Sequence, residues 1–298
     1  MGFLIKYFVS VLLGKLSCKV KFKKFRHVFF QCLVCTLAVS SCQNASTDVA
    51  SAQLAISNFI NKSCIYLLGR KPYEAEMQQA QSFFAKNGFT QTSREKYLLN
   101  ITLSDEYKLY LFQLARNDLM NFIFNPDSLQ IQNTIDVWTK MYPNDYGRKE
   151  IARLKKLQTI SADLLNGSLD NIGMQKRLIH NSYYDFINMG TENFVISMYN
   201  NFFDRPPTKY ELGLGKMMVD SSESSFMGNK GHCKEDFVAL FFESYPYYEG
   251  QVRTLYKRYF FSEPPPEYLA ALTLEYYKSR DLRKLQALLL SIGELKEL

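Results

Sequence analysis

The sequence predicts an all-α protein, built from helical modules of about 50 residues that contain Arg-x-Pro turns, behind a short N-terminal leader. Three observations predict this fold class. Apolar residues recur at three- and four-residue spacing from about residue 52 onward, which is typical of amphipathic helices. The sequence has no convincing alternation of apolar and polar residues and no convincing Asn-Gly hairpin signal, so no strand is expected. One turn pattern also occurs in separate copies.

The leader, residues 1–41, carries the whole net charge of the chain. It holds seven basic residues and no acidic residue, whereas the full chain has 36 Lys and Arg, 29 Asp and Glu and a formal charge of +7. The remaining residues therefore carry 29 basic and 29 acidic side chains, so the chain after the leader is formally neutral. A basic surface for nucleic acid is consequently not expected.

The leader ends in a pattern that indicates covalent lipid attachment. A segment rich in basic residues, 19–27, precedes an apolar stretch, residues 28–39. This stretch is shorter than the roughly 20 residues that a membrane span requires. Two serines and Cys42 follow. This order resembles the lipobox leader of bacterial lipoproteins, which implies that residues 1–41 are a cleaved signal peptide and that Cys42 carries the acyl chains, palmitate among them. The alternative, a retained membrane-anchored N-terminus with its basic segment on the cytoplasmic side, stays open.

The residue after Cys42 bears on the destination of the chain. Lipoproteins that lack Asp at this position usually travel to the outer membrane, and this chain has Gln43 there. The resemblance therefore implies an outer-membrane protein that contacts the bilayer only through its lipid, on either the periplasmic or the surface face.

Residues 42–54 contain the lipidated Cys and a polar tether, and the helices follow it. We expect an N-terminal helical domain over residues 55–190 and C-terminal helical repeats over residues 191–298. One apolar stripe predicts the first helix, and a second stripe, closed by Gly167, predicts a helix near the middle of the chain. The residues of the two stripes are Ile56, Phe59, Ile60, Cys64 and Leu67, then Ile151, Leu154, Leu157, Ile160 and Leu164.

The repeated turn lies at residues 66–77 and again at residues 201–212. Each copy has large apolar residues at a helix end, then Arg-x-Pro, then a helix with Glu in its first turn. In the second copy, Thr208 and Glu211 are spaced for a capping box, whereas Tyr73 replaces the Thr in the first copy. A structural role is expected for both turns, with ligand recognition by the arginines as the alternative. The predicted turn residues are Arg70, Pro72, Glu76, Arg205, Pro207, Thr208 and Glu211.

The end of each module has its own pattern, a helix that finishes in Ser and is followed by an aromatic residue. This pattern occurs at residues 97–107 and 237–247, and in a copy without a preceding turn at residues 177–184. A looser copy of the turn itself spans residues 259–266, where Glu263 replaces the Arg. The sequence therefore predicts repetition of one helical unit along the chain.

The residues of the first module carry a resemblance to a known family. Residues 67–72, Glu76 and residues 104–107 together resemble the core pattern of phycobilisome linker domains and of a related bacterial helical repeat. Asp204 of the second copy stands where that pattern has Gly. The resemblance implies a helical module that holds other proteins together. It implies no chromophore site, since the leader indicates a secreted protein.

The sequence offers few residues for catalysis or for metal binding. It contains no Gly-x-Ser-x-Gly elbow, phosphate-binding loop, dinucleotide fingerprint or His-Glu-x-x-His helix, so we expect no enzyme and no cofactor. His232 and Cys233 are adjacent but lack a second ligand pair at metal spacing, so no metal is expected. Acid pairs at residues 105–106 and 235–236 are interpreted as solvated helix flanks. Whether Cys64 and Cys233 form a disulfide is left open, because the sequence does not give their separation.

Aromatic residues concentrate between Phe241 and Phe261. Most are expected in the core, but Tyr is also favoured at interfaces because it combines an apolar body with a polar tip. The predicted binding residues are Tyr245, Tyr247, Tyr248, Tyr256 and Tyr259. The sequence thus favours a lipid-anchored, non-enzymatic scaffold or accessory subunit of an outer-membrane protein complex, with other envelope proteins as partners. The alternative is a glycan- or peptidoglycan-binding lipoprotein that stacks sugars on exposed aromatics.

Overall fold

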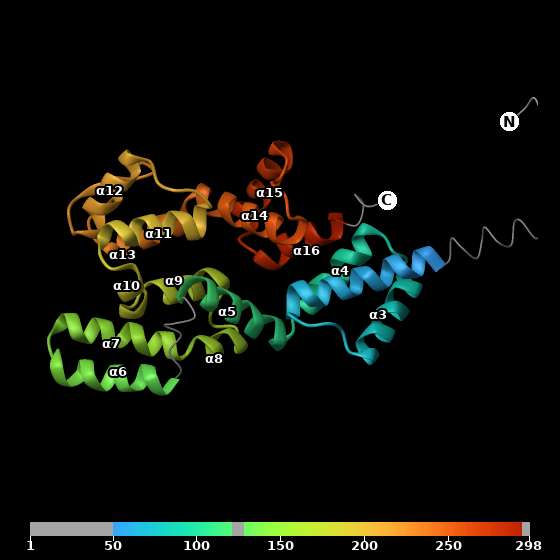
Figure 1. The fold of residues 1–298 in the computed structure, drawn as a ribbon, viewed down its shortest axis with the longest axis horizontal. Helices are drawn as coiled ribbons and strands as arrows, with labels where there is room; N and C mark the ends of the chain where they lie inside the picture. Colours follow the sequence, from blue (N-terminus) through green and yellow to red (C-terminus); the bar gives the residue numbers. More distant parts are fainter. Residues whose placement is uncertain (1–49, 121–127, 294–298) are drawn as a thin grey trace, which may run out of the picture. The chain divides into compact units, whose positions relative to one another are not determined.

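The computed structural model describes residues 50–120 and 128–293. The predicted signal peptide, Cys42 and most of the tether lie outside these residues. Within them the fold is all-α, as predicted (Figure 1). A helix over residues 50–68 comes first. The helices that follow are α3 (Glu74–Asn87), α4 (Gln91–Ile101), α5 (Asp105–Met120), α6 (Ser128–Met141), α7 (Asp145–Gln158), α8 (Ile160–Leu165), α9 (Asn171–Ile179), α10 (Ser182–Asn188), α11 (Thr191–Phe203), α12 (Lys209–Val219), α13 (Lys234–Glu243), α14 (Tyr245–Phe260), α15 (Pro266–Ser279) and α16 (Leu282–Gly293).

A short β-hairpin between α12 and α13 departs from the expectation that the chain forms no strand. It consists of β1 (Ser224–Phe226) and β2 (Asn229–Gly231), which pair antiparallel. The two turn residues, Met227 and Gly228, both have positive φ, at 51° and 84°. Such tight turns favour Asn or Gly at both positions. Because Met227 occupies the first position, the sequence gives no hairpin signal there. Strands of three residues are also too short to display an alternating pattern.

Residues 56–298 form one compact unit. The predicted boundary between residues 190 and 191 lies inside this unit and stays a prediction. Helices distant in sequence pack together, and α4 lies against α16. The buried Arg94 of α4 donates from Nε to the carbonyl oxygen of Ser291 in α16 at 3.0 Å. This contact joins the first module to the last one.

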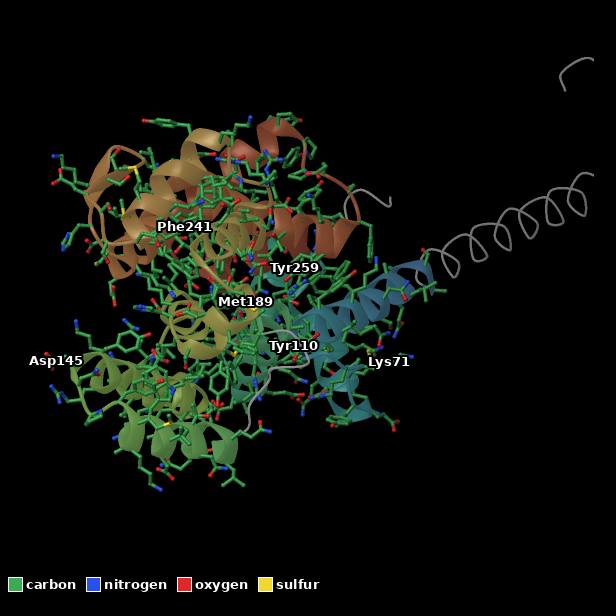
Figure 2. All side chains as sticks on the ribbon, turned by 60° about the vertical axis from the view of Figure 1, so that its left-hand side comes forward. Lys71, Tyr110, Asp145, Met189, Phe241 and Tyr259 are labelled. Carbon is green, nitrogen blue, oxygen red and sulfur yellow. The ribbon has the colours of Figure 1, made fainter. Side chains whose placement is uncertain are left out.

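The core around α11, α13 and α14 is rich in aromatic rings. Phe241 is fully buried there, and Figure 2 labels it among the side chains of this region. Its ring stacks on Phe203 at 4.1 Å between centroids and meets Tyr199 and Phe226 at 5.5 Å each. Aromatic pairs of this kind contribute about 0.5–1.5 kcal/mol beyond the burial of their area. The dense aromatic segment of the sequence is thus mainly core.

None of the helices in the described part of the chain is both long and apolar enough to cross a bilayer.

Candidate functional site

The first Arg-x-Pro turn is held together by one arginine that binds two carboxylates. Arg70 donates from Nη1 and Nη2 to the two carboxylate oxygens of Glu76, at 2.8 Å each. It also donates from Nε and Nη2 to the carboxylate of Glu106, at 2.5 and 2.7 Å. Two bidentate pairs on one guanidinium fix its position, since charge-assisted bonds are stronger than neutral ones. These hydrogen bonds raise the pKa of Arg70 and lower the pKa of Glu76.

The arginine of the second turn makes the same hydrogen bonds as the arginine of the first turn, apart from the pair with Glu106. Arg205 donates from Nη1 and Nη2 to Glu211 at 2.9 and 2.7 Å, and from Nη1 to the Pro206 carbonyl oxygen at 3.1 Å. In the first turn, Arg70 donates to the Lys71 carbonyl oxygen at the same 3.1 Å. The prolines, Pro72 and Pro207, each precede the residue that caps the next helix. The predicted repeat of the turn is therefore present in the structure.

Thr208 occupies the N-cap position of α12, as predicted. Its hydroxyl accepts the Glu211 N–H at 3.2 Å, and the Glu211 carboxylate accepts the Thr208 N–H at 2.8 Å. Such a cap contributes about 0.5–2 kcal/mol. In the first copy, the side chain of Tyr73 makes no capping hydrogen bond, but its N–H donates to Glu76 at 2.8 Å. The first copy therefore keeps only one hydrogen bond of the capping box, the one from the N-cap N–H to the Glu carboxylate.

The ion pair in the second turn depends on pH. Hydrogen bonds from Arg205 hold the pKa of Glu211 at about 2, below its usual value of 4.5. Because the folded-state pKa is lowered, this pair stabilises the fold at pH values above about 4.5, and the stabilisation is lost as the pH falls toward 2.

The third copy of the turn has a different register from the one predicted. The helix before each turn ends in a residue with positive φ, namely Gly69, Asp204 and Phe261, at 74°, 56° and 53°. The residue that follows is Arg in the first two copies and Ser262 in the third. The prediction that Glu263 replaces the Arg was therefore wrong by one position. Glu263 instead accepts from Lys257 at 2.7 Å, within the α14–α15 connection.

The module ends also share one geometry. In two copies the serine donates from Oγ to a carbonyl oxygen three residues earlier, Ser104 to Ile101 at 2.8 Å and Ser244 to Phe241 at 2.6 Å. The buried tyrosine three residues later donates to a glutamine. Tyr107 binds Gln286 at 2.5 Å and Tyr247 binds Gln175 at 2.6 Å. At residues 177–184, Asn181 takes the position of the serine, and its side chain accepts the Tyr184 N–H at 3.2 Å. Tyr107 and Tyr247, the tyrosines at the ends of these two modules, therefore have a structural role.

The two acid pairs that sequence analysis interpreted as solvated helix flanks have specific partners. Glu106 binds Arg70, as described above. Glu235 binds Arg153, and Asp236 lies 3.0 Å from Nδ1 of His232. All four carboxylates lie in the first turn of a helix and their side chains are 37–71% exposed, which agrees with the interpretation. The sequence pattern did not show that Glu106 and Glu235 also pair with arginines distant in sequence.

Four of the five predicted binding tyrosines lie in the core. Tyr247, Tyr248, Tyr256 and Tyr259 are buried, and only Tyr245 is substantially exposed, at 40%. Tyr259 accepts a hydrogen bond from Gln286 at 2.9 Å, so its hydroxyl has a partner within the protein. The structure therefore contradicts direct partner contact by these four residues, because their rings are covered by neighbouring helices.

A partly exposed aromatic cluster lies elsewhere, on the α6–α7 hairpin, where Trp138 is partly buried and its two tyrosine neighbours are exposed. It consists of Trp138, Tyr142 and Tyr146, here called the Trp138 cluster. The ring of Trp138 lies 4.8 Å from that of Tyr142 and 5.7 Å from that of Tyr146. Tyr142 and Tyr146 are 42% and 63% exposed. This cluster was not predicted from the sequence. The single Trp of the chain and the i, i+4, i+8 spacing of the three aromatic residues are nevertheless a signal that their rings lie close together.

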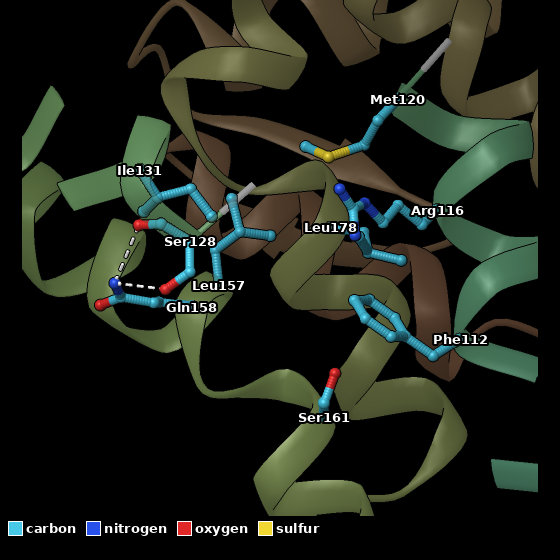
Figure 3. Close-up of a pocket in the computed structure, with 9 residues that line it drawn as sticks. All are labelled: Phe112, Arg116, Met120, Ser128, Ile131, Leu157, Gln158, Ser161 and Leu178. Carbon is cyan, nitrogen blue, oxygen red and sulfur yellow. Dashed lines mark hydrogen bonds between the residues drawn. The ribbon is translucent and has the colours of Figure 1, made fainter. Parts of the chain in front are cut away.

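The cavities of the described residues offer no catalytic constellation. One cavity, of 470 Å³, lies between the start of α5, the α8–α9 connection and the α15–α16 turn. Its charged side chains are engaged with neighbours: Lys108 binds Asp105, Arg283 binds Asp281, and Arg280 binds Glu243. A smaller cavity of 140 Å³ is lined by residues of α5, α6, α7, α8 and α9, both apolar and polar (Figure 3). Its polar lining includes Arg116 and Gln158, and Gln158 donates to Ser128.

The two cysteines within the described residues, Cys64 and Cys233, are free thiols, which answers the question that the sequence left open. Comparisons of the chain with protein-family models, with curated proteins and with solved structures found no match. The resemblance to linker domains accordingly stays a prediction.

Proposed function

We propose that this chain is a lipid-anchored protein of the cell envelope that acts as a non-enzymatic scaffold or accessory subunit of an outer-membrane protein complex. The proposed location rests on the sequence of the leader. The proposed binding role rests chiefly on one observation, the Trp138 cluster. Repetition of the Arg-x-Pro turn supports a rigid framework, because both turns fix their arginines with bidentate ion pairs.

The surroundings of the Trp138 cluster favour a protein partner. Val137 and Met141 of α6 are also exposed, at 51% and 65%, and their i, i+4 spacing places them on one helix side next to Trp138 and Tyr142. Trp, Tyr and Met are enriched in protein–protein interfaces, where a few buried aromatic anchors supply most of the binding free energy. Apolar contact suits a chain whose charges are balanced, since long-range steering by charge is weak.

The alternative of a glycan-binding lipoprotein has one observation in its favour. Asn144 and Asp145 lie between Tyr142 and Tyr146, and sugar sites combine aromatic rings with polar groups of this kind. Both side chains, however, are already used locally. Asn144 accepts the Gly147 N–H at 2.9 Å, and Asp145 pairs with Arg148. The protein partner is therefore the preferred proposal.

Paired substitution of Trp138 and Tyr146 by alanine is expected to weaken partner binding by about 30-fold or more, because loss of one interface anchor typically costs about 2 kcal/mol. The measurement is co-purification in mild detergent, quantified by mass spectrometry, with folding checked by circular dichroism. Tyr210→Ala is the matched control, since Tyr210 is 74% exposed on α12 and does not belong to the cluster. Equal recovery of partners with a folded double variant would contradict the proposal, and binding of purified peptidoglycan fragments instead would favour the alternative.

Cys42→Ser is expected to abolish labelling of the chain with a palmitate analogue and to leave a slower-migrating precursor, because serine offers no thiol for acylation. Metabolic labelling followed by gel electrophoresis and membrane fractionation makes the measurement. Cys35→Ser, within the same leader, is the control and keeps the label. Undiminished labelling of the Cys42→Ser chain would refute the lipid anchor without touching the proposed binding surface.

A further inference from the structure

Three potential metal ligands of different chemistry meet where β2 joins α13. The imidazole of His232, the thiol of Cys233 and the carboxylate of Asp236 each offer one ligand atom, and these atoms lie within 4.8 Å of one another. Nitrogen, sulfur and oxygen ligands of these types are the ones that bind Zn²⁺ in proteins. No metal was expected here, because the sequence has no second His or Cys pair at metal spacing and Asp236 belongs to an acid pair interpreted as solvated.

The local fold explains why these side chains converge. β2 ends at Gly231 and α13 begins at Lys234, so His232 and Cys233 form the entire connection. Asp236 lies in the first turn of α13 and accepts the His232 N–H at 2.9 Å, which turns the carboxylate back toward the connection. Gly231 permits this approach, since a Cβ at that position would lie 2.8 Å from the Asp236 Cβ.

The thiol of Cys233 takes no part in capping α13. Cys233 is the N-cap of α13, but its side chain makes no capping hydrogen bond, and it forms no disulfide. Neighbouring cations are paired with other carboxylates, Lys234 with Asp185 and Arg153 with Glu235. A thiolate and a carboxylate would together balance the charge of a divalent ion at this helix start, where the helix dipole alone disfavours a cation.

The distances are compatible with a zinc site after a small side-chain adjustment. Zinc ligands at bond lengths of about 2.0–2.3 Å in a tetrahedron lie roughly 3.5 Å from each other. The Nδ1 of His232 is already 3.0 Å from the nearer oxygen of Asp236, and the His232 side chain is 78% exposed, so it is free of packing that would oppose its rotation. Three protein ligands would leave one coordination position for water or for a group from outside.

We propose that His232, Cys233 and Asp236 form a binding site for a divalent transition-metal ion of the zinc type, which clips the β-hairpin to the first turn of α13. This site is separate from the Trp138 cluster and does not depend on the proposed scaffold function.

The test uses Co²⁺ as a spectroscopic probe and Zn²⁺ as a competitor. The full chain carries Cys32→Ala and Cys35→Ala, so that the Cys-x-x-Cys pair of the leader supplies no thiolate, and is reduced and stripped of metal in mild detergent. Titration with Co²⁺ is expected to produce a thiolate-to-cobalt charge-transfer band that Zn²⁺ removes. Cys233→Ser is expected to abolish this band, and His232→Gln and Asp236→Asn to weaken Co²⁺ binding by about tenfold or more.

Cys64→Ala is the matched control, because Cys64 is the other free thiol of the described residues and is buried. It is expected to keep the band. The proposal is overturned if no saturable band appears, if Cys233→Ser binds Co²⁺ as the parent chain does, or if the band disappears with Cys64→Ala instead. Each substitution at the site is conservative, and the three residues are exposed or partly exposed. Circular dichroism checks that each variant folds.

Discussion

Replacement of Gly250 by alanine is expected to lower the free energy of unfolding by about 3 kcal/mol. Gly250 lies in α14 where this helix crosses the end of α11. A Cβ at Gly250 would overlap the carbonyl oxygen of Phe202 and lie 2.6 Å from the Cα of Phe203. These are backbone atoms, which cannot rotate away as a side chain can, so the two helices must separate. Overpacking typically costs about 1–3 kcal/mol, and an immovable neighbour places this substitution at the upper end.

Gly213→Ala provides the matched control for the Gly250 substitution. Gly213 also lies within a helix, α12, but a Cβ there would meet no atom within 4 Å. Alanine favours the helix by about 0.5–1 kcal/mol over glycine, so Gly213→Ala is expected to stabilise the protein. Urea denaturation followed by circular dichroism measures both variants. A shift of the urea midpoint in the same direction for both variants would contradict the close approach of α14 to α11.

Phe241→Ala is expected to lower the free energy of unfolding by about 3–5 kcal/mol, the cost typical of removing a buried phenylalanine. The ring is fully buried and stacks on Phe203 at 4.1 Å. Its loss leaves a cavity and removes ring contacts with α11, with β1 of the hairpin and within α13. Calorimetric or denaturant unfolding gives the measurement, with a lowered midpoint as the expected result.

Phe261→Ala is the control for Phe241→Ala, since it makes the same change in the same aromatic segment. Phe261 is 86% exposed at the end of α14. Its removal is expected to change stability by no more than about 0.5 kcal/mol. Comparable losses in the two variants would mean that the burial pattern of this segment is wrong.

Features that depend on neighbours in sequence could be predicted from the sequence. The fold class follows from helical periodicity, and the turn at Arg205, Thr208 and Glu211 completes its hydrogen bonds within seven residues. The first turn is equally local except for Glu106, which lies 36 residues from Arg70. Spacing predicts short-range capping well because only a few backbone conformations join such residues.

Features that depend on tertiary packing could not be predicted in the same way. Tyrosine has an apolar body and a polar tip, so composition alone does not separate a buried ring such as Tyr247 from an interface residue. A glutamine on α9, Gln175, decides the case by accepting the Tyr247 hydroxyl. The grouping of His232, Cys233 and Asp236 was missed for a related reason, since the direction of a side chain at a helix start depends on the preceding connection.

The module end that lacks an Arg-x-Pro turn separates the proposed binding surface from the repeated turns. The pattern of α9 and Asn181 repeats the end of a module, yet α6, α7 and α8 stand in front of it in place of the arginine turn. Each Arg-x-Pro turn satisfies most of its hydrogen bonds between residues close in sequence, and Trp138 lies on α6, outside both turns. The surface around Trp138 can therefore change in sequence while the hydrogen bonds of both turns stay intact.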